Sequence, residues 1–157
     1  GLTCGKLNDV WRFSFSSKTW TRLDSVDNTP HPMKMKSFFP LDTTTTLLLD
    51  QLENVRLVRE RPAKRGRHDV VLVGHFLLVV GGFVGIHRVN DIYAFHLPTC
   101  VWYVVHGAAP YHFAPREAFS MALVHDHLYL FGGWHAKGWF SDIVQLNVQP
   151  FLSFSSR

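Results

Sequence analysis

An internal repeat with a spacing of 51 residues limits what this 157-residue chain can fold into more than any other feature of its sequence. Residues 65–102 and 116–153 superimpose at that offset without a gap. The shift aligns two apolar runs, an Asp-Ile pair and a double glycine, which is Gly81-Gly82 in the first copy and Gly132-Gly133 in the second. Repeats of this size are supersecondary units that bury their apolar faces against their neighbours, so we expect equivalent modules side by side.

Each copy of the repeat reads as four short strands. The apolar runs VVLV (70–73) and FLLVV (76–80) meet at a tight turn, and two further runs flank a turn at HLPTC (96–100). The 13 phenylalanines, 5 tryptophans and 11 glycines also favour strands and tight turns over a helical bundle. We therefore predict an all-β fold built from four-stranded antiparallel meanders.

A partial third copy opens the chain at an offset of 82, where NDVWRF (8–13) falls on NDIYAF (90–95). The double glycine of this copy would come just before Gly1, so we expect the repeat to continue outside this sequence. The predicted organisation is the second half of a module at 1–23, an insertion at 24–61, a module at 62–106 and a module at 107–157 that degenerates towards its C-terminal end.

The insertion at 24–61 is predicted to be an irregular loop followed by a short helix. Its first part, SVDNTPHPMKMKSFFP, holds three prolines, and Pro62 ends the helical pattern. The apolar residues at helical spacing are Leu48, Leu49, Leu52, Val55 and Val58. A recently inserted or mistranslated segment is the alternative.

The order of these signals resembles the kelch repeat, and the match covers nearly the whole chain except the insertion. The second copy departs from the pattern at Phe119, Val144 and Ser153. The resemblance implies a partial kelch-type β-propeller whose remaining blades lie outside this sequence, with Trp20 and Trp102 buried between blades. The residues that carry the resemblance in the better copy are Arg65, His68, Gly81, Gly82, Asn90, Asp91, Tyr93, Phe95 and Trp102.

We predict no catalytic, metal or cofactor site in this sequence. The double glycines are not followed by the helix that a phosphate-binding loop requires. His125 and His127 belong to one strand turn, whereas His135 belongs to the opposite end of an antiparallel blade, too far away to share a metal ion. No G-x-S-x-G nucleophile motif occurs. The alternative to a non-enzymatic protein is part of an enzyme, with a site in the ring or a catalytic domain outside this sequence.

Charge and cysteine content restrict the partner and the compartment. The net charge is only +4, and the basic stretch 56–67 is interpreted as a solvated face, so nucleic acid is not expected as a partner. Cys4 and Cys100 lack the spacing of a disulfide or zinc framework, which indicates a reducing compartment, the cytoplasm or alternatively the nucleus. No apolar run approaches the ~20 residues of a membrane span.

A protein-binding face is predicted at one end of the blades. In an up-and-down blade, the loop between strands two and three and the loop between blades emerge on the same side. A mixture of aromatic residues and a few cations is typical of protein interfaces, and the resemblance implies a scaffold, adaptor or substrate receptor. The alternative is that an aromatic residue here, Trp134 and Phe140 above all, packs back against neighbouring loops. The residues expected on this face are His87, Arg88, Tyr111, His112, Phe113, Trp134, His135, Lys137, Trp139 and Phe140.

An incomplete set of blades exposes the apolar flanks that its neighbours would cover. We therefore predict that these 157 residues, expressed alone, aggregate or stay partly molten. Size-exclusion chromatography and thermal unfolding test this, and a clean monomer with a cooperative transition would contradict it.

Overall fold

The computed structural model describes residues 5–24, 55–107 and 113–153. The chain divides into two units, one made of Gly1–Asn8 with Val55–Arg157 and the other of Asp9–Asn54. Nearly all described elements are antiparallel strands, so the predicted all-β class is confirmed. Within these ranges, no helix is long and apolar enough to cross a membrane.

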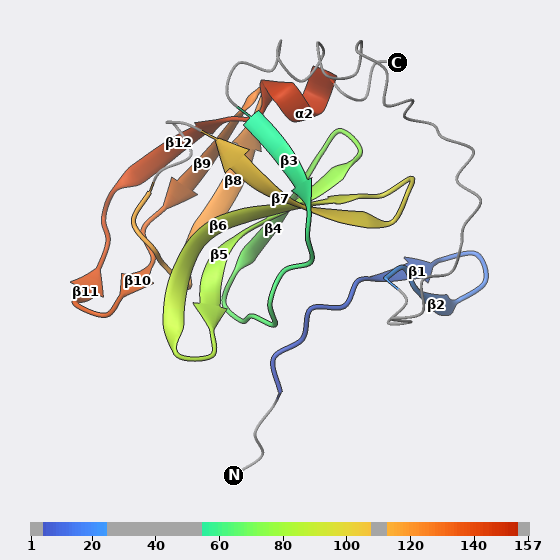
Figure 1. Ribbon diagram of the computed structural model, residues 1–157, viewed down its shortest axis with the longest axis horizontal. Coiled ribbons are helices and arrows are strands. Elements are labelled where there is room, and N and C mark those ends of the chain that lie inside the picture. Colours follow the sequence, from blue (N-terminus) through green and yellow to red (C-terminus); the bar gives the residue numbers. More distant parts are fainter. Residues whose placement is uncertain (1–4, 25–54, 108–112, 154–157) are drawn as a thin grey trace. The chain divides into compact units, whose positions relative to one another are not determined.

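The first blade of the larger unit is a five-stranded antiparallel sheet in the order β3-β7-β6-β5-β4 (Figure 1). Strands β4 to β7 form the four-stranded meander that the repeat predicts, and β3 adds a fifth strand at the outer edge. Its strands are β3 (Val55–Arg59), β4 (Asp69–Val73), β5 (Phe76–Val84), β6 (His87–His96) and β7 (Val101–Gly107).

Strand β3 corrects the helix predicted from apolar spacing, because Val55 and Val58 lie in a strand. Val58 is opposite Val104 in the ladder with β7, and Leu57 packs against the hydrophobic core. The free edge of β7 offers backbone partners to a segment rich in β-branched residues, whereas an isolated short helix is marginal in water. The rest of the predicted helix lies outside the described residues.

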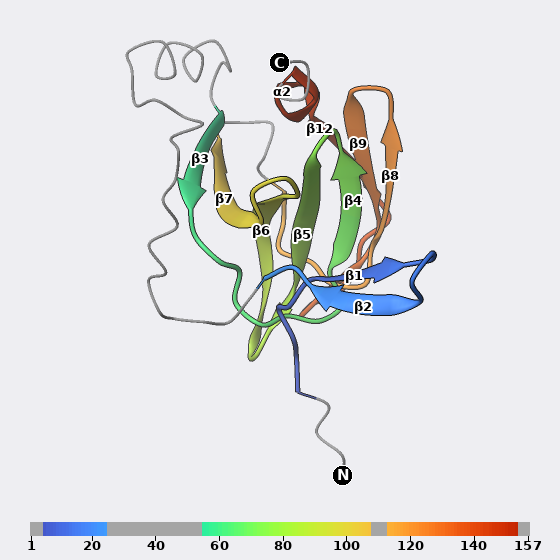
Figure 2. The ribbon, with the colours of Figure 1, turned by 90° about the vertical axis from the view of Figure 1, so that its right-hand side faces the viewer.

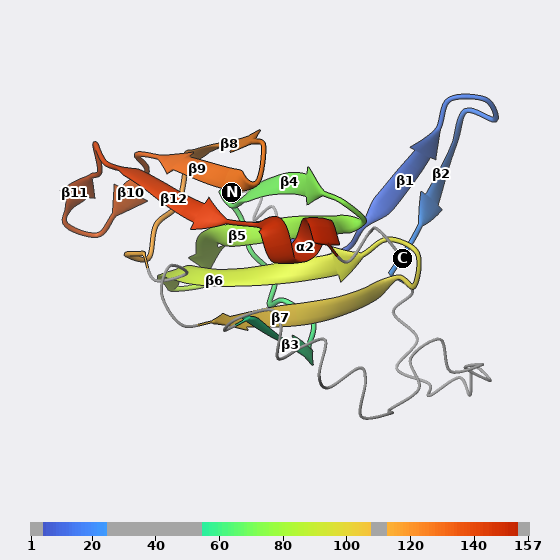
Figure 3. The ribbon, with the colours of Figure 1, turned by 90° about the horizontal axis from the view of Figure 1, so that it is seen from above.

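The second blade has three long strands and a small hairpin, and its chain then turns into a helix. Pro150 fits the first turn of this helix but cannot donate a hydrogen bond to a strand ladder, so residues 149–153 form a helix rather than a strand. The helix lies over the first blade (Figure 3), and its Phe151 packs on Phe76 of that blade with ring centroids 5.6 Å apart. The elements are β8 (Ser120–Val124), β9 (His127–Phe131), β10 (Trp134–His135), β11 (Gly138–Trp139), β12 (Ile143–Asn147) and α2 (Gln149–Ser153).

The two blades stand side by side (Figure 2), and they share one hydrophobic core, with β4 in contact with β8. Leu78 and Val80 of the first blade belong to the same buried cluster as Leu130 of the second. Across this contact, the backbone N–H of Met121 donates to the carboxylate of Asp69 at 3.0 Å. Equivalent sheets therefore pack face to face, as the repeat predicts.

The smaller unit contains a hairpin of β1 (Trp11–Ser14) and β2 (Thr19–Arg22). Trp20 stacks on Phe13 with centroids 5.0 Å apart, yet 65% of its surface stays exposed. In the described part of the smaller unit, Trp20 is therefore exposed and not buried between blades as predicted, because its hairpin has only two strands. Trp102, in contrast, is buried against Phe95, its cross-strand partner in the same blade, and its burial between blades stays a prediction.

Each blade contains a buried arginine that we call the arginine clamp. In the second blade, Nη1 of Arg116 donates to the carbonyl oxygen of Gly132 at 2.9 Å and to Asp142 at 2.7 Å, while Nη2 donates to the other Asp142 oxygen at 2.9 Å. Arg116 is only 1% exposed. In the first blade, the same three bonds join Arg65 to Gly81 and Asp91. The clamp thus ties the entry of a blade to its second and third strands.

A second set of bonds, which we call the joint, connects the third strand of one blade to the entry of the next. The amide of Asn90 donates to the carbonyl oxygen of Phe113 at 2.6 Å, and the N–H of Arg116 donates to the carbonyl oxygen of Val89 at 3.2 Å. An equivalent pair of bonds forms the preceding joint. Its third-strand residues lie 82 positions before Val89 and Asn90, and its blade-entry residues lie 51 positions before Phe113 and Arg116. These bonds join Asn8 to Pro62 at 3.0 Å and Arg65 to Leu7 at 3.3 Å.

We predict that Gly82→Ala strongly destabilises the first blade. Gly82 has a φ of +99°, and a Cβ there would lie 2.8 Å from Cβ of His68 and 2.9 Å from the carbonyl oxygen of Gly66. Backbone strain plus overpacking should cost about 3 kcal/mol or more. Gly85→Ala is the matched control, because its φ is +63° but nothing lies within 4 Å. Denaturant unfolding of the natural full-length chain measures both, and equal losses would contradict the argument.

We predict that the clamp of the second blade makes stability fall on acidification. The hydrogen bond from Arg116 holds the pKa of Asp142 below its ordinary value of 3.8. A depressed folded-state pKa stabilises the fold above the unfolded-state pKa, and this contribution disappears as the pH falls through the folded-state value. Unfolding free energies between pH 6 and pH 2 should therefore drop more in the wild type than in Asp142→Asn. Parallel curves for the two proteins would be evidence against the clamp.

Candidate functional site

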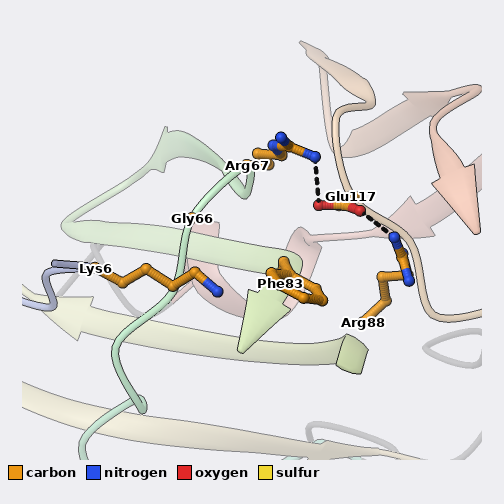
Figure 4. Close-up of a pocket in the computed structure, with 6 residues that line it drawn as sticks. All are labelled: Lys6, Gly66, Arg67, Phe83, Arg88 and Glu117. Atoms are coloured by element: carbon orange, nitrogen blue, oxygen red, sulfur yellow. Dashed lines mark hydrogen bonds and ion pairs between the residues drawn. The ribbon is translucent and has the colours of Figure 1, made fainter. Parts of the chain in front are cut away.

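An open pocket of about 280 Å³ lies at the end of the blades where β5 turns into β6. Three cations surround one aromatic ring and one carboxylate there, and Figure 4 shows how the side chains are arranged. This is the end of the blades on which the sequence predicts a binding face. The lining residues are Lys6, Gly66, Arg67, Phe83, Arg88 and Glu117.

Glu117 is the anionic group of the pocket and is almost completely buried, with 1% of its surface exposed. Its carboxylate accepts a hydrogen bond from Arg88 at 2.6 Å and another from Arg67 at 3.3 Å (Figure 4). Its backbone pairs with Trp134 in both directions, at 2.7 and 3.1 Å. A buried carboxylate requires such partners, so this residue of the second blade holds the arginines of the first blade in place.

Phe83 lies between two of the cations (Figure 4). Nζ of Lys6 is 3.8 Å from the ring centroid, and the guanidinium carbon of Arg88 is 5.3 Å from it. The backbone of Phe83 pairs with that of Gly66, at 2.8 and 3.1 Å. Cation–π attraction and this bridge fix the ring, so the pocket has a positioned apolar surface beneath its charged rim.

A pair of tryptophans borders the pocket on the second blade. Trp134 in β10 and Trp139 in β11 are cross-strand partners whose ring centroids lie 5.0 Å apart. Trp139 is 74% exposed, while the backbone of Trp134 is bonded to Glu117 in the pocket wall. The backbone bridge between Glu117 and Trp134 thus connects the hairpin that carries the pair to the wall of the pocket.

The structure places the predicted binding residues in different environments. His87, Lys137 and Trp139 are exposed, and Arg88 lines the pocket. Trp134, His135 and Phe140 are half-buried around the β10–β11 hairpin, with the guanidinium of Arg116 4.1 Å from the Phe140 ring centroid. Phe113 is buried in the core, so its ring is not on the surface. Tyr111 and His112 lie outside the described residues. Contact of any of these residues with a partner remains a prediction.

Sequence reasoning missed most of the pocket, namely Lys6, Gly66, Arg67, Phe83 and Glu117. The predicted binding residues lie in the loops between strands and between blades, whereas Gly66, Arg67 and Glu117 lie just before the first strand of a blade. A signal was nevertheless present in the repeat. The offset of 82 places Lys6 on Arg88, and the offset of 51 places Gly66 on Glu117.

The site offers binding groups rather than groups arranged for acid–base or metal chemistry. Among the residues that the structure describes, no three His, Cys, Asp or Glu side chains converge where they could hold a metal ion. His68 lies close to Gly82 in the first blade. Its burial, followed by the charge of Arg65, lowers its pKa, so it is neutral at pH 7.

Comparison with known sequences adds an independent finding. The sequence profile of the KLHDC2/KLHL20/DRC7 Kelch-repeats domain matches residues 37–153. Kelch domain-containing protein 10 of Rattus norvegicus is 26% identical over 112 residues, which are 68% of this chain and 27% of that protein. The protein of the same name from Mus musculus is also 26% identical over 112 residues, 68% of this chain and 25% of that protein. The chain thus spans about a quarter of the length of these curated relatives.

Proposed function

Because this chain belongs to the Kelch-repeat family, we propose that it is a non-enzymatic protein–protein interaction module of a scaffold, an adaptor or a substrate receptor. Kelch repeats generally mediate binding between proteins, and the family is typically non-enzymatic. The observation that carries the proposal is the exposed Trp139, which pairs with the half-buried Trp134 on the end of the blades that also holds a cationic pocket. The proposed partner is another protein.

The tryptophan pair has the physical properties of an interface anchor. A buried aromatic side chain removes ~150–250 Å² from water, and tryptophan and arginine are enriched among the residues that dominate binding energy. Trp139 is held by a cross-strand partner in a short hairpin, so little conformational entropy is lost when a partner covers it. Its 74% exposure is therefore more easily explained by a missing partner than by a role in the core.

We also propose that further blades complete the ring around this chain. The outer face of the second blade exposes Val124, Phe131 and Ile143. Phe131 and Ile143 are opposite each other in the β9–β12 ladder, so they form one apolar surface. Another blade packed on this surface would bury it, just as the second blade buries the facing side of the first.

A reducing compartment, the cytoplasm, is the proposed location. The support is Cys100, which is an exposed free thiol in the β6–β7 turn. Exposed unpaired cysteines are compatible with a reducing environment, where disulfides are rare.

We predict that Trp139→Ala lowers capture of the partner at least tenfold, because loss of an anchor typically costs more than ~1.4 kcal/mol. The measurement is quantitative cross-linking and pull-down from cell lysate with the natural full-length chain. The control is Phe15→Ala, which removes a similarly exposed aromatic residue from the turn of the β1–β2 hairpin (77% exposed). Equal capture by Trp139→Ala would overturn the proposal, and loss of protease resistance in that variant would place the indole in the core.

Arg88 is a less suitable test of binding than the sequence suggests. From the sequence, replacing Arg88 should weaken binding without unfolding the protein. In the structure, Arg88 donates to the buried carboxylate of Glu117 at 2.6 Å. Its removal would leave that carboxylate with a weaker set of partners, so binding and stability would change together.

A further inference from the structure

The pocket is the result of a difference between two equivalent joints. In one joint, Arg88 of the first blade pairs with Glu117 at the entry of the second blade, at 2.6 Å. The repeat offsets of 82 and 51 place Lys6 and Gly66 at the equivalent positions of the preceding joint. That joint therefore keeps the cation but has a glycine where the carboxylate would be.

The space for a carboxylate is open beside Gly66. A Cβ at this position would meet only Cγ and Cε of Lys6, both at 3.9 Å, which is ordinary van der Waals contact. Lys6 and Gly66 both line the pocket, and Lys6 has no carboxylate partner in the described part of the chain. Its ammonium group lies instead over the ring of Phe83.

We propose that this pocket accepts the carboxylate side chain of an acidic residue of a partner protein. That carboxylate takes the place beside Lys6 that Glu117 takes beside Arg88 in the next joint. The inference rests on the proposed function, since it names the chemistry by which a protein partner is recognised at this site.

The net charge of the pocket favours an anion, and its aromatic ring favours the side chain of an acidic residue. Lys6, Arg67 and Arg88 bring three positive charges, and Glu117 brings one negative charge, so two positive charges remain. Glu117 binds Arg88 at 2.6 Å but Arg67 only at 3.3 Å, and the Arg67 side chain is 70% exposed. An entering carboxylate is attracted by Lys6 and Arg67, and inorganic phosphate, which these cations attract as well, has no methylene groups to contact Phe83. Phe83 provides an apolar surface for the methylene groups of the entering side chain.

The first experiment supplies the missing carboxylate from the chain itself, in the natural full-length protein. Gly66→Glu is compared with Gly66→Gln, which adds the same volume without charge. Gly66 does not have a left-handed φ, so neither substitution strains the backbone. We expect the Glu variant to melt about 2 °C above the Gln variant, a difference that disappears in Lys6→Met and in 1 M salt. Equal melting temperatures of the Gly66→Glu and Gly66→Gln variants in a protein that retains Lys6 would overturn the proposed geometry.

The second experiment measures binding with a defined probe. The probe is the peptide Gly-Gly-Glu-Gly-Gly, acetylated and amidated so that its only carboxylate is the side chain. The control peptide carries Gln in place of Glu. Titration by ligand-observed NMR should show at least fivefold tighter binding of the Glu peptide. This preference should be lost in Lys6→Met and in Gly66→Glu, and retained in Lys64→Met, which removes an exposed lysine outside the pocket.

The outcomes separate this inference from the proposed function. No preference for the Glu peptide, or tighter binding of inorganic phosphate than of acetate, would overturn the carboxylate site. A preference that depends on Lys6 supports it, even if Trp139→Ala leaves partner capture unchanged and so contradicts the interaction role. Loss of capture in Trp139→Ala together with no peptide preference would support the interaction role and contradict the carboxylate site.

Discussion

The arginine clamp is the interaction on which the rest of the structure depends. Arg116 is buried to 1% exposure, and its guanidinium is satisfied by the carbonyl oxygen of Gly132 and both oxygens of Asp142. Breaking such a buried pair by removing one partner typically costs ~3–5 kcal/mol, because it leaves an uncompensated charge. The exposed side of Asp142 reduces this figure through solvent screening. Arg65 repeats the arrangement in the first blade, so the entries of both blades are fixed in the same way.

The clamp also determines where the binding groups stand. The residue after each clamp arginine, Gly66 in one blade and Glu117 in the next, is placed at the rim of the pocket. The scaffold holds this position constant, while the residue type there changes the charge of the joint. Function on this fold therefore depends on a few side chains at equivalent positions rather than on the sheets themselves.

The tryptophan pair could be found from the sequence because its members lie close together in one loop. Trp134 and Trp139 are five positions apart, and a loop between the second and third strands brings such residues to one surface. The pocket could not be found in the same way. Lys6, Phe83 and Glu117 come from three distant segments that only the joint and the face-to-face packing of two blades bring together. Phe113 shows the reverse case, since a residue in a predicted loop is drawn into the core.

The sequence alone determined the repeated unit, its antiparallel meander and its kelch character, because apolar runs, double glycines and the Arg, Asn and Asp positions recur in register. These are local properties, and repetition makes them recognisable. Only the tertiary structure decided that residues 55–59 form a strand, that residues 149–153 form a helix, and that the pocket exists. Those outcomes depend on which free edge, core surface or charge lies nearby in space. A backbone segment adopts the conformation that satisfies its hydrogen bonds and buries its apolar side chains against those particular neighbours.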